Sequence, residues 1–224
     1  QTGLLDLDIH GPSIGKMLGI EDLRLQAIGD HIMPVKVTGS LKVVSMALLL
    51  NETDSPVVWR GPMKAAATKQ FLGEVEWGEL DYLIVDLPPG TGDEALNIIQ
   101  FAPSVEGAVI VTTPQDVAVL DATKAIKFVE MMDLSVLGVI ENMSGMVCPH
   151  CGEVVDIFGK GGGEKAAEQY KVPYLGAIPL DIEMRKAADE GRPFIIRTPG
   201  KTSPTWDAVD KVMENLIAVI ESKE

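Results

Sequence analysis

Several features that define other classes of protein are scarce in this 224-residue sequence. It has two cysteines, three residues apart, which excludes a secreted disulfide framework. The sequence has only 19 Lys and Arg residues but 33 Asp and Glu residues, and the resulting net charge of −14 argues against a nucleic-acid partner. No apolar run approaches the roughly 20 residues that span a bilayer, and we find no charged-then-apolar leader. We therefore expect a cytoplasmic protein with neither membrane nor nucleic-acid partners.

Aromatic residues make up only 5% of the chain, which suits a parallel sheet packed by Val, Ile, Leu and Ala. Short apolar runs alternate with helical segments, which predicts an α/β fold: one mostly parallel sheet with helices on both faces. The predicted strands are residues 3–8, 41–46, 82–85, 108–111, 136–140 and 175–178. The predicted helices are residues 63–76, 93–101, 117–132, 164–170, 182–189 and 206–220. No linker or internal repeat divides the chain, so we expect a single domain over residues 1–224.

The stretch over residues 81–93 gives the first indication of function. Residues 82–85 are apolar without alternation, as expected of a strand buried on both faces of a parallel sheet. The run ends at Asp86, and a loop rich in proline and glycine follows. Open α/β sheets bind ligands at the carboxyl ends of their strands, and in nucleotide hydrolases such a carboxylate holds Mg²⁺ through water. The alternative is a strand that ends in an ordinary turn.

The Cys-Pro-His-Cys-Gly run from Cys148 to Gly152 is the most informative chemical motif. Two thiolates at this spacing can bind one metal, and together they form half of the four-ligand set that zinc or a [4Fe–4S] cluster requires. A two-fold homodimer would supply the other half. His150 lies between the cysteines and is not expected to reach the same metal. The alternatives are inert buried cysteines or a thioredoxin-like redox pair, although that pair opens a helix and residues 153–158 look extended.

Five segments resemble, in order, motifs of the Mrp/ApbC family of iron–sulfur carrier ATPases, in the MinD-like branch of P-loop NTPases. They are LDLDIHGPS (5–13), WRGPM (59–63), DLPPGTGD (86–93), ENMS (141–144) and CPHC (148–151). The resemblance extends from the first residue to about Arg192. It implies an ATPase that binds a cluster across a homodimer and transfers it to apo-proteins under the control of ATP binding and hydrolysis.

Two rival hypotheses remain beside this interpretation. One is a MinD-like regulatory or positioning ATPase with a structural zinc at the dimer interface. The other is a degenerate, non-hydrolysing member of the family. Anaerobic purification separates the first rival from the carrier, because a carrier is brown with acid-labile sulfide whereas the rival is colourless with zinc.

The resemblance also implies roles for individual residues, with ATP/ADP and Mg²⁺ as cofactors. Asp8 resembles the switch aspartate that orients the attacking water, and Asp86 resembles the Walker B aspartate. Asn142 and Pro179 resemble contacts with the edge of adenine, with Asp181 as a weaker third. For these residues the alternative is helix capping or plain turn chemistry. The loop that relays the nucleotide state would comprise Pro88, Pro89, Gly90, Thr91, Gly92 and Asp93. The cluster, or zinc in its place, would bind Cys148 and Cys151.

The family's phosphate-binding loop has no counterpart in this sequence. In the family, a strand and a Gly-Lys-Gly-Gly-x-Gly-Lys-[Ser/Thr] loop precede the equivalent of Gly3, so we expect a further N-terminal segment of roughly 30 residues or more. The run over residues 159–166 fails the P-loop pattern at Glu164 and at Ala166, and we interpret it as the glycine-rich start of a helix. The expected domain is therefore N-terminally incomplete, with a metal-binding insertion near residues 145–158.

Overall fold

The computed structural model describes residues 1–49, 61–197, 200 and 202–223. The chain divides into two compact units, each described here by itself. Unit 1 comprises Gln1–Pro103 and Met184–Ile196, and unit 2 comprises Ser104–Glu183 and Arg197–Glu224. The single-domain assignment stays a prediction. Trp59 and Arg60, which begin one of the five motifs, lie outside the described residues.

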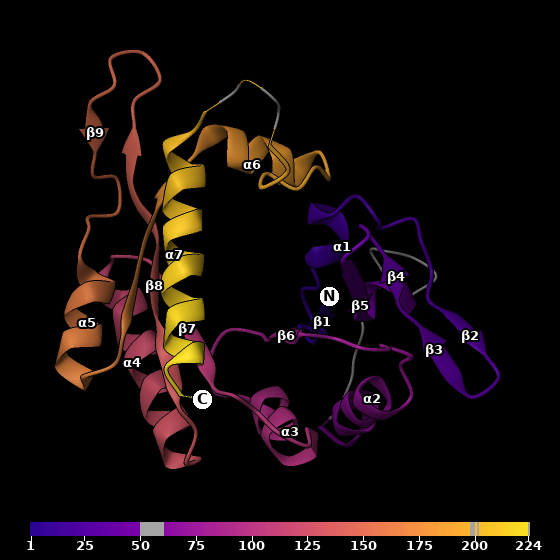
Figure 1. Cartoon of the computed structure of the whole chain (residues 1–224). Helices are drawn as coiled ribbons and strands as arrows, with labels where there is room; N and C mark the ends of the chain where they lie inside the picture. The colour runs from indigo at the N-terminus through magenta and orange to yellow at the C-terminus, as the bar shows by residue number, and fades with distance from the viewer. Residues whose placement is uncertain (50–60, 198–199, 201, 224) are drawn as a thin grey trace. The chain divides into compact units, whose positions relative to one another are not determined.

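Unit 1 contains a four-stranded sheet in the order β4-β5-β1-β6 (Figure 1). The strand β1 pairs in parallel with both β5 and β6, whereas β4 is antiparallel at one edge. The strands are β1 (Thr2–Asp6), β4 (Val35–Lys36), β5 (Leu41–Ser45) and β6 (Tyr82–Asp86), with a separate hairpin of β2 (Gln26–Ile28) and β3 (His31–Met33). The helices are α1 (Ile14–Met17), the short 3₁₀ helix η1 (Met46–Leu49), α2 (Gly61–Gly73) and α3 (Asp93–Phe101). Central strand β1 is thus flanked on both sides, as a buried strand requires.

Unit 2 contains a parallel sheet in the order β10-β8-β7, and β9 adds an antiparallel pair to the far end of β8 (Figure 1). The strands are β7 (Ala108–Thr112), β8 (Val136–Val147), β9 (Val154–Val155) and β10 (Tyr174–Leu180). The helices are α4 (Asp116–Met131), α5 (Gly162–Tyr170) and α7 (Pro204–Glu221), while α6 (Ile182–Asp189) spans the division between the units. Helix α7 packs on β10 and β8. The helices α4 and α5 share one apolar cluster with β7 and β8, built around Ile110, Ile126, Val139 and Ala167.

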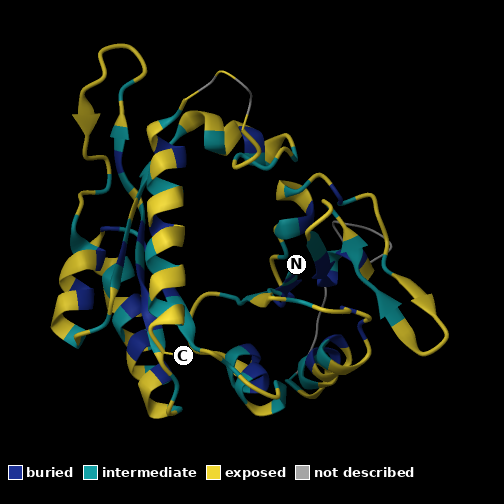
Figure 2. Cartoon of the chain, viewed as in Figure 1, coloured by how far each residue is buried: buried dark blue, intermediate teal, exposed yellow. Residues whose placement is uncertain are grey.

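The predicted α/β fold class and most of the predicted elements are confirmed, with two informative differences. Strand β8 runs past its predicted end at Ile140 as far as Val147 and so reaches the first cysteine. Strand β6 was expected to be buried on both faces, but Tyr82, Leu83 and Ile84 are 46%, 38% and 51% exposed. Among the described residues β6 pairs with β1 alone, so its other edge is open (Figure 2). None of the described helices is both long enough and apolar enough to cross a bilayer.

A buried ion pair joins α2 to α3 in unit 1. Lys64 Nζ lies 2.5 Å from Glu94 Oε1, and the two side chains are 14% and 6% exposed. Burial by itself would raise the pKa of Glu94, but the hydrogen bond and the charge of Lys64 outweigh it and lower that pKa. Because the folded pKa lies below the unfolded one, the pair stabilises the fold at neutral pH. That stabilisation is lost as the pH falls through the folded pKa.

We expect Lys64→Met to lower the free energy of unfolding at neutral pH by about 3 kcal/mol, because Glu94 is left buried without its counter-charge. Urea unfolding at neutral and acid pH measures this, and the loss should shrink in acid, where Glu94 takes up a proton. The control is Lys64→Met combined with Glu94→Gln, which removes the unpaired charge and should recover part of the stability. A Lys64→Met protein as stable as the wild type at neutral pH contradicts the assignment.

Candidate functional site

Three aspartates lie at the carboxyl ends of two neighbouring strands in unit 1. Parallel pairing puts Asp6 of β1 opposite Asp86 of β6, and the Leu7 amide donates to the Asp86 carbonyl at 2.9 Å. The carboxylate of Asp6 is fully buried and accepts hydrogen bonds from Ser45 Oγ at 2.9 Å and from the Asp8 amide at 3.1 Å. Asp6 therefore fixes the backbone at the start of the loop that carries Asp8.

Burial and the charge of neighbouring carboxylates raise the pKa values of two of these aspartates. Burial is the largest cause that raises the pKa of Asp6, to about 6, and the charge of Asp86 adds to it. The pKa of Asp86 is also raised, by burial and then by the charge of Asp8. Asp8 itself is part-exposed, and its Oδ1 accepts the Gly11 amide at 3.0 Å. The hydrogen bond from the Gly11 amide is the one expected if Asp8 is a turn residue. The repulsion between Asp8 and Asp86 supports the functional alternative, because a bound divalent cation would relieve it.

The raised pKa of Asp6 has a measurable effect on stability. The folded pKa of about 6 exceeds the reference value of 3.8, so stability should fall as the pH rises between these values and stay lower above them. We expect Asp6→Asn to raise the free energy of unfolding at neutral pH by about 2–3 kcal/mol. An asparagine can still accept from the Asp8 amide and can share a hydrogen bond with Ser45.

Urea unfolding as a function of pH, without nucleotide or Mg²⁺, tests this expectation. Asp22→Asn, at an exposed position, is the charge-matched control. Identical pH profiles for Asp6→Asn and the wild type would show that Asp6 titrates normally.

The predicted relay loop connects β6 to α3. Gly90 adopts φ +96°, a left-handed conformation that favours glycine, and Gly92 is the N-cap of α3. Asp93 begins the helix, and a Cβ added to Gly61 of α2 would lie 3.2 Å from its Oδ2. The loop therefore ends against the start of α2, beside the buried Lys64–Glu94 pair. Sequence reasoning missed this pair, since no local pattern links two residues on separate helices.

Asn142 and Pro179 are brought together in unit 2. Parallel pairing of β8 with β10 puts Asn142 opposite Ile178, and Pro179 is the next residue. The Asn142 Oδ1 accepts the Met143 amide at 3.0 Å, and Met143 adopts φ +58°. This local bond orients the Asn142 side chain, one residue past the last pair of β7 with β8, Thr112 with Glu141.

Asp181 accepts hydrogen bonds at the starts of two helices, and these bonds give it a structural role. Its Oδ1 accepts the Glu183 amide at 2.7 Å, at the start of α6, and its Oδ2 accepts Thr205 Oγ1 at 2.7 Å, at the start of α7. Ser203 Oγ lies 3.4 Å from the same Oδ2. These contacts favour the capping alternative for Asp181, and its contact with adenine stays a prediction.

The two cysteines lie at the tip of the hairpin formed by the end of β8 and by β9. The Cys148 amide donates to the Glu153 carbonyl at 2.8 Å, and the Gly152 amide donates to the Cys148 carbonyl at 2.9 Å. Gly152 adopts φ +77°, which closes the turn. The extended segment expected after the motif is confirmed as β9, so the motif does not open a helix as a redox pair would.

Both thiols are free and accessible. Cys148 is partly exposed and Cys151 is exposed, which excludes the inert buried alternative. The backbone N–H groups of Cys151 and His150 lower the pKa of the Cys148 thiol, which favours the thiolate that binds metal. The hairpin also exposes apolar side chains: Val147 is 41% exposed, Val154 62% and Ile157 46%. A second protein surface can cover these side chains.

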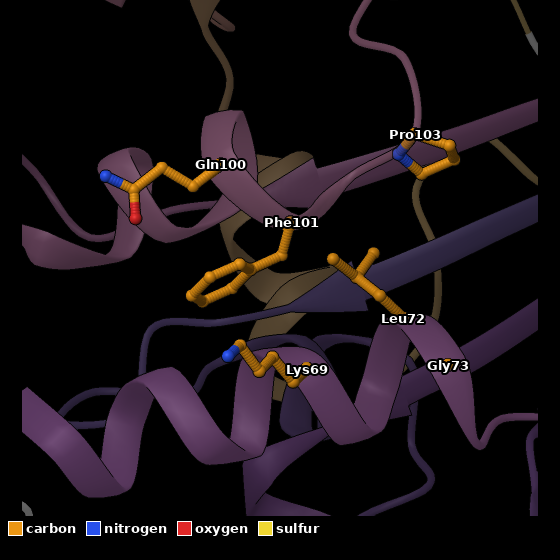
Figure 3. A pocket seen from close by; sticks show the side chains of 6 residues that line it. All are labelled: Lys69, Leu72, Gly73, Gln100, Phe101 and Pro103. Carbon is orange, nitrogen blue, oxygen red and sulfur yellow. The ribbon is translucent and has the colours of Figure 1, made fainter.

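In the described part of the chain no three His, Cys, Asp or Glu side chains group closely enough to hold a metal ion. A cavity of about 360 Å³ lies between the ends of α2 and α3, where Lys69 Nζ is 4.4 Å from the Phe101 ring centroid (Figure 3). None of the predicted site residues lines it.

Residues 1–217 match the family described as "ParA: NUBPL iron-transfer P-loop NTPase". The chain belongs to this family. Within this NUBPL-type family it is 48% identical to the "Iron-sulfur cluster carrier protein" of Methanocaldococcus jannaschii, over 100% of this chain and 76% of the relative. It is also 48% identical to the "Cytosolic Fe-S cluster assembly factor CFD1" of Saccharomyces cerevisiae, over 81% of this chain and 64% of the relative. The resemblance inferred from the five motifs is confirmed.

Solved structures agree with this assignment. A nucleotide-binding protein from Archaeoglobus fulgidus in complex with ADP, in which cobalt was found, matches 92% of this chain and 78% of its own. The TM-score is 0.74 and the identity 38%. The septum site-determining protein MinD of Pyrococcus horikoshii matches 100% of this chain and 86% of its own, with a TM-score of 0.68 and 20% identity. The latter likeness confirms the MinD-like fold alone.

Proposed function

We propose that this protein is an ATP-dependent iron–sulfur cluster carrier, which binds its cluster between two copies of the cysteine hairpin and delivers it to apo-proteins. The observation that carries the proposal is the free thiol pair Cys148 and Cys151, partly exposed and exposed, at the tip of a hairpin. One chain offers two thiols and a [4Fe–4S] cluster takes four, so two chains complete the site. The exposed apolar side chains around the thiols supply surface for the second copy.

The nucleotide side of the proposal rests on unit 1. Asp86 would hold Mg²⁺ through water, and Mg²⁺ would neutralise charge on the transferred phosphate. Asp8 would orient the attacking water, with its backbone fixed by Asp6. The loop of residues 88–93 would report the state of the nucleotide to α2, since Asp93 Oδ2 lies close enough to Gly61 to meet any Cβ added there. Phosphoryl transfer needs positioning more than covalent help, and these residues supply positioning.

The proposed contacts with adenine lie in unit 2. Asn142 and Pro179 would contact the edge of the base, and Asp181 would be a weaker third contact. Strand β8 carries Asn142 and extends to Val147, next to Cys148, although its register against β10 shifts between Asn142 and Met146. One strand therefore connects Asn142 to the hairpin, and a change at Asn142 on nucleotide binding can reach the hairpin along it. We propose that ATP binding and hydrolysis control cluster release along this path.

The proposal includes a strand, phosphate loop and helix that precede Gln1. The open edge of β6, with Ile84 51% exposed, is the observation in unit 1 that supports it. In unit 2, β7 pairs with β8 alone among the described strands, and Val111 is 60% exposed. A parallel strand added to such an edge would cover it. The intact mass of the natural protein tests this: several kilodaltons above 24.1 kDa supports the segment, and 24.1 kDa rules out both the segment and the ATPase.

A transfer assay tests the function. Protein loaded with cluster under anaerobic conditions is mixed with an apo-ferredoxin, with ATP or with a non-hydrolysable analogue. We expect cluster transfer that depends on hydrolysis. A colourless protein with zinc and no acid-labile sulfide would instead identify the MinD-like regulatory ATPase. Cluster transfer at the same rate with ATP and with the analogue would support a carrier whose transfer does not depend on ATP hydrolysis.

A further inference from the structure

Glu141 is a buried carboxylate in β8 to which the proposed function gives no task. Only 1% of the surface of Glu141 is exposed. Its Oε1 accepts hydrogen bonds from Ser144 Oγ at 2.5 Å and from the Gly161 amide at 2.8 Å, and its Oε2 accepts the Gly163 amide at 2.7 Å. Three donors satisfy the buried charge, and the N-terminal end of α5 adds a favourable helix dipole.

These donors come from the two sides of the cysteine hairpin. Ser144 lies on the outgoing strand, whereas Gly161 and Gly163 lie where the chain returns to begin α5. One side chain therefore closes the base of a loop that contains both cysteines.

Apart from the pairing of Met146 with Leu180 of β10, few other contacts hold the hairpin. No residue from Met146 to Gly162 is buried, and every one of them is described (Figure 2). Its strands share two residue pairs, Met146 with Val155 and Val147 with Val154. A two-stranded hairpin without a packed face is marginal in water, so its position depends on the base.

The glycine run that resembles a P-loop fits this contact. Gly161 adopts φ +79° as the N-cap of α5, a conformation that favours glycine. A Cβ at Gly163 would lie 3.1 Å from Glu141 Cβ, and one at Gly162 would overlap the Pro114 carbonyl oxygen. The glycines let the backbone approach Glu141 closely enough for both amides to donate.

We propose that Glu141 is a positioning residue for the cysteine pair: it holds the base of the hairpin closed and thereby fixes where Cys148 and Cys151 are presented. This inference rests on the proposed function, in which the two thiols bind metal. Glutamine is the sensitive replacement, because its amide NH₂ would face a backbone N–H where the carboxylate now accepts. Aspartate keeps both acceptor oxygens on a shorter side chain.

The test compares Glu141→Gln and Glu141→Asp with Glu164→Gln. Glu164 is exposed in the first turn of the same helix, so its variant makes the same charge change without touching the hairpin base. Two readouts are used: hydrogen exchange of peptides covering residues 144–163, and anaerobic titration with Co²⁺, followed by its thiolate charge-transfer absorption. We expect Glu141→Gln to exchange faster in this segment alone and to bind Co²⁺ about 10–100-fold more weakly. Glu141→Asp should be intermediate and Glu164→Gln unchanged.

Wild-type exchange and wild-type Co²⁺ affinity in Glu141→Gln would overturn the inference. Faster exchange throughout unit 2 in both Glu141 variants would also overturn it, since it would assign Glu141 to general stability. The proposed function fails differently: the wild type itself would then show no cysteine-dependent Co²⁺ absorption, whatever the exchange data show.

Discussion

Replacing Cys148 and Cys151 together by serine is expected to abolish cluster binding and to leave ATP binding largely unchanged. In the proposed site each chain contributes two of the four cluster ligands, so the double substitution would remove all four from a homodimer. Serine is a poor ligand for iron at neutral pH because its hydroxyl stays protonated, whereas the pKa of the Cys148 thiol is already lowered. Iron and acid-labile sulfide after anaerobic reconstitution measure the loss, and a fluorescent ATP analogue measures nucleotide binding.

His150→Ala is the matched control for the cysteine variants. It changes the residue between the two thiols and should leave cluster binding intact, because in the proposed site four thiolates complete the ligand set without it. Cluster uptake by the double serine variant would place the ligands elsewhere. Loss of cluster in His150→Ala would show that the imidazole is itself a ligand.

The second large effect is expected at Asp8. Asp8→Asn should lower the rate of ATP hydrolysis at least about 100-fold, since an amide orients water without the carboxylate's charge or basicity. The Asn oxygen can still accept the Gly11 amide, so the local turn should survive. ATP binding and cluster content should stay at wild-type levels.

Steady-state phosphate release measures the effect, with exposed Asp22→Asn as the control for the loss of one carboxylate. Hydrolysis within a few-fold of wild type in Asp8→Asn would make Asp8 a turn residue. Its hydrogen bond to Gly11 would then be its whole role.

The sequence predicted well those features that depend on local pattern. Uninterrupted apolar runs gave the parallel strands, and carboxylates at the ends of β1 and β6 were expected at one edge of a sheet. The first strand was predicted to end at Asp8, but β1 ends at Asp6, and it is Asp6 that the register places opposite Asp86. The thiol pair was predicted to lie in a tight turn before an extended segment, and the structure places it there.

Other features depend on contacts between distant residues, which one sequence does not reveal. The Lys64–Glu94 pair forms because α2 packs on α3, and the sequence of neither helix indicates that the other is its packing partner. Strand β8 continues past Ile140 because β10 pairs with it as far as Met146 and β9 returns to pair with its end. The role of the glycine run became clear only when Glu141 was seen to accept two of its amides.

Native mass spectrometry of the anaerobically reconstituted protein tests the central claim most directly. The account predicts a species of two chains that carries one [4Fe–4S] cluster, and it predicts that this species disappears in the double serine variant. A cluster-bound single chain, or a dimer that carries zinc and no sulfide, would contradict it.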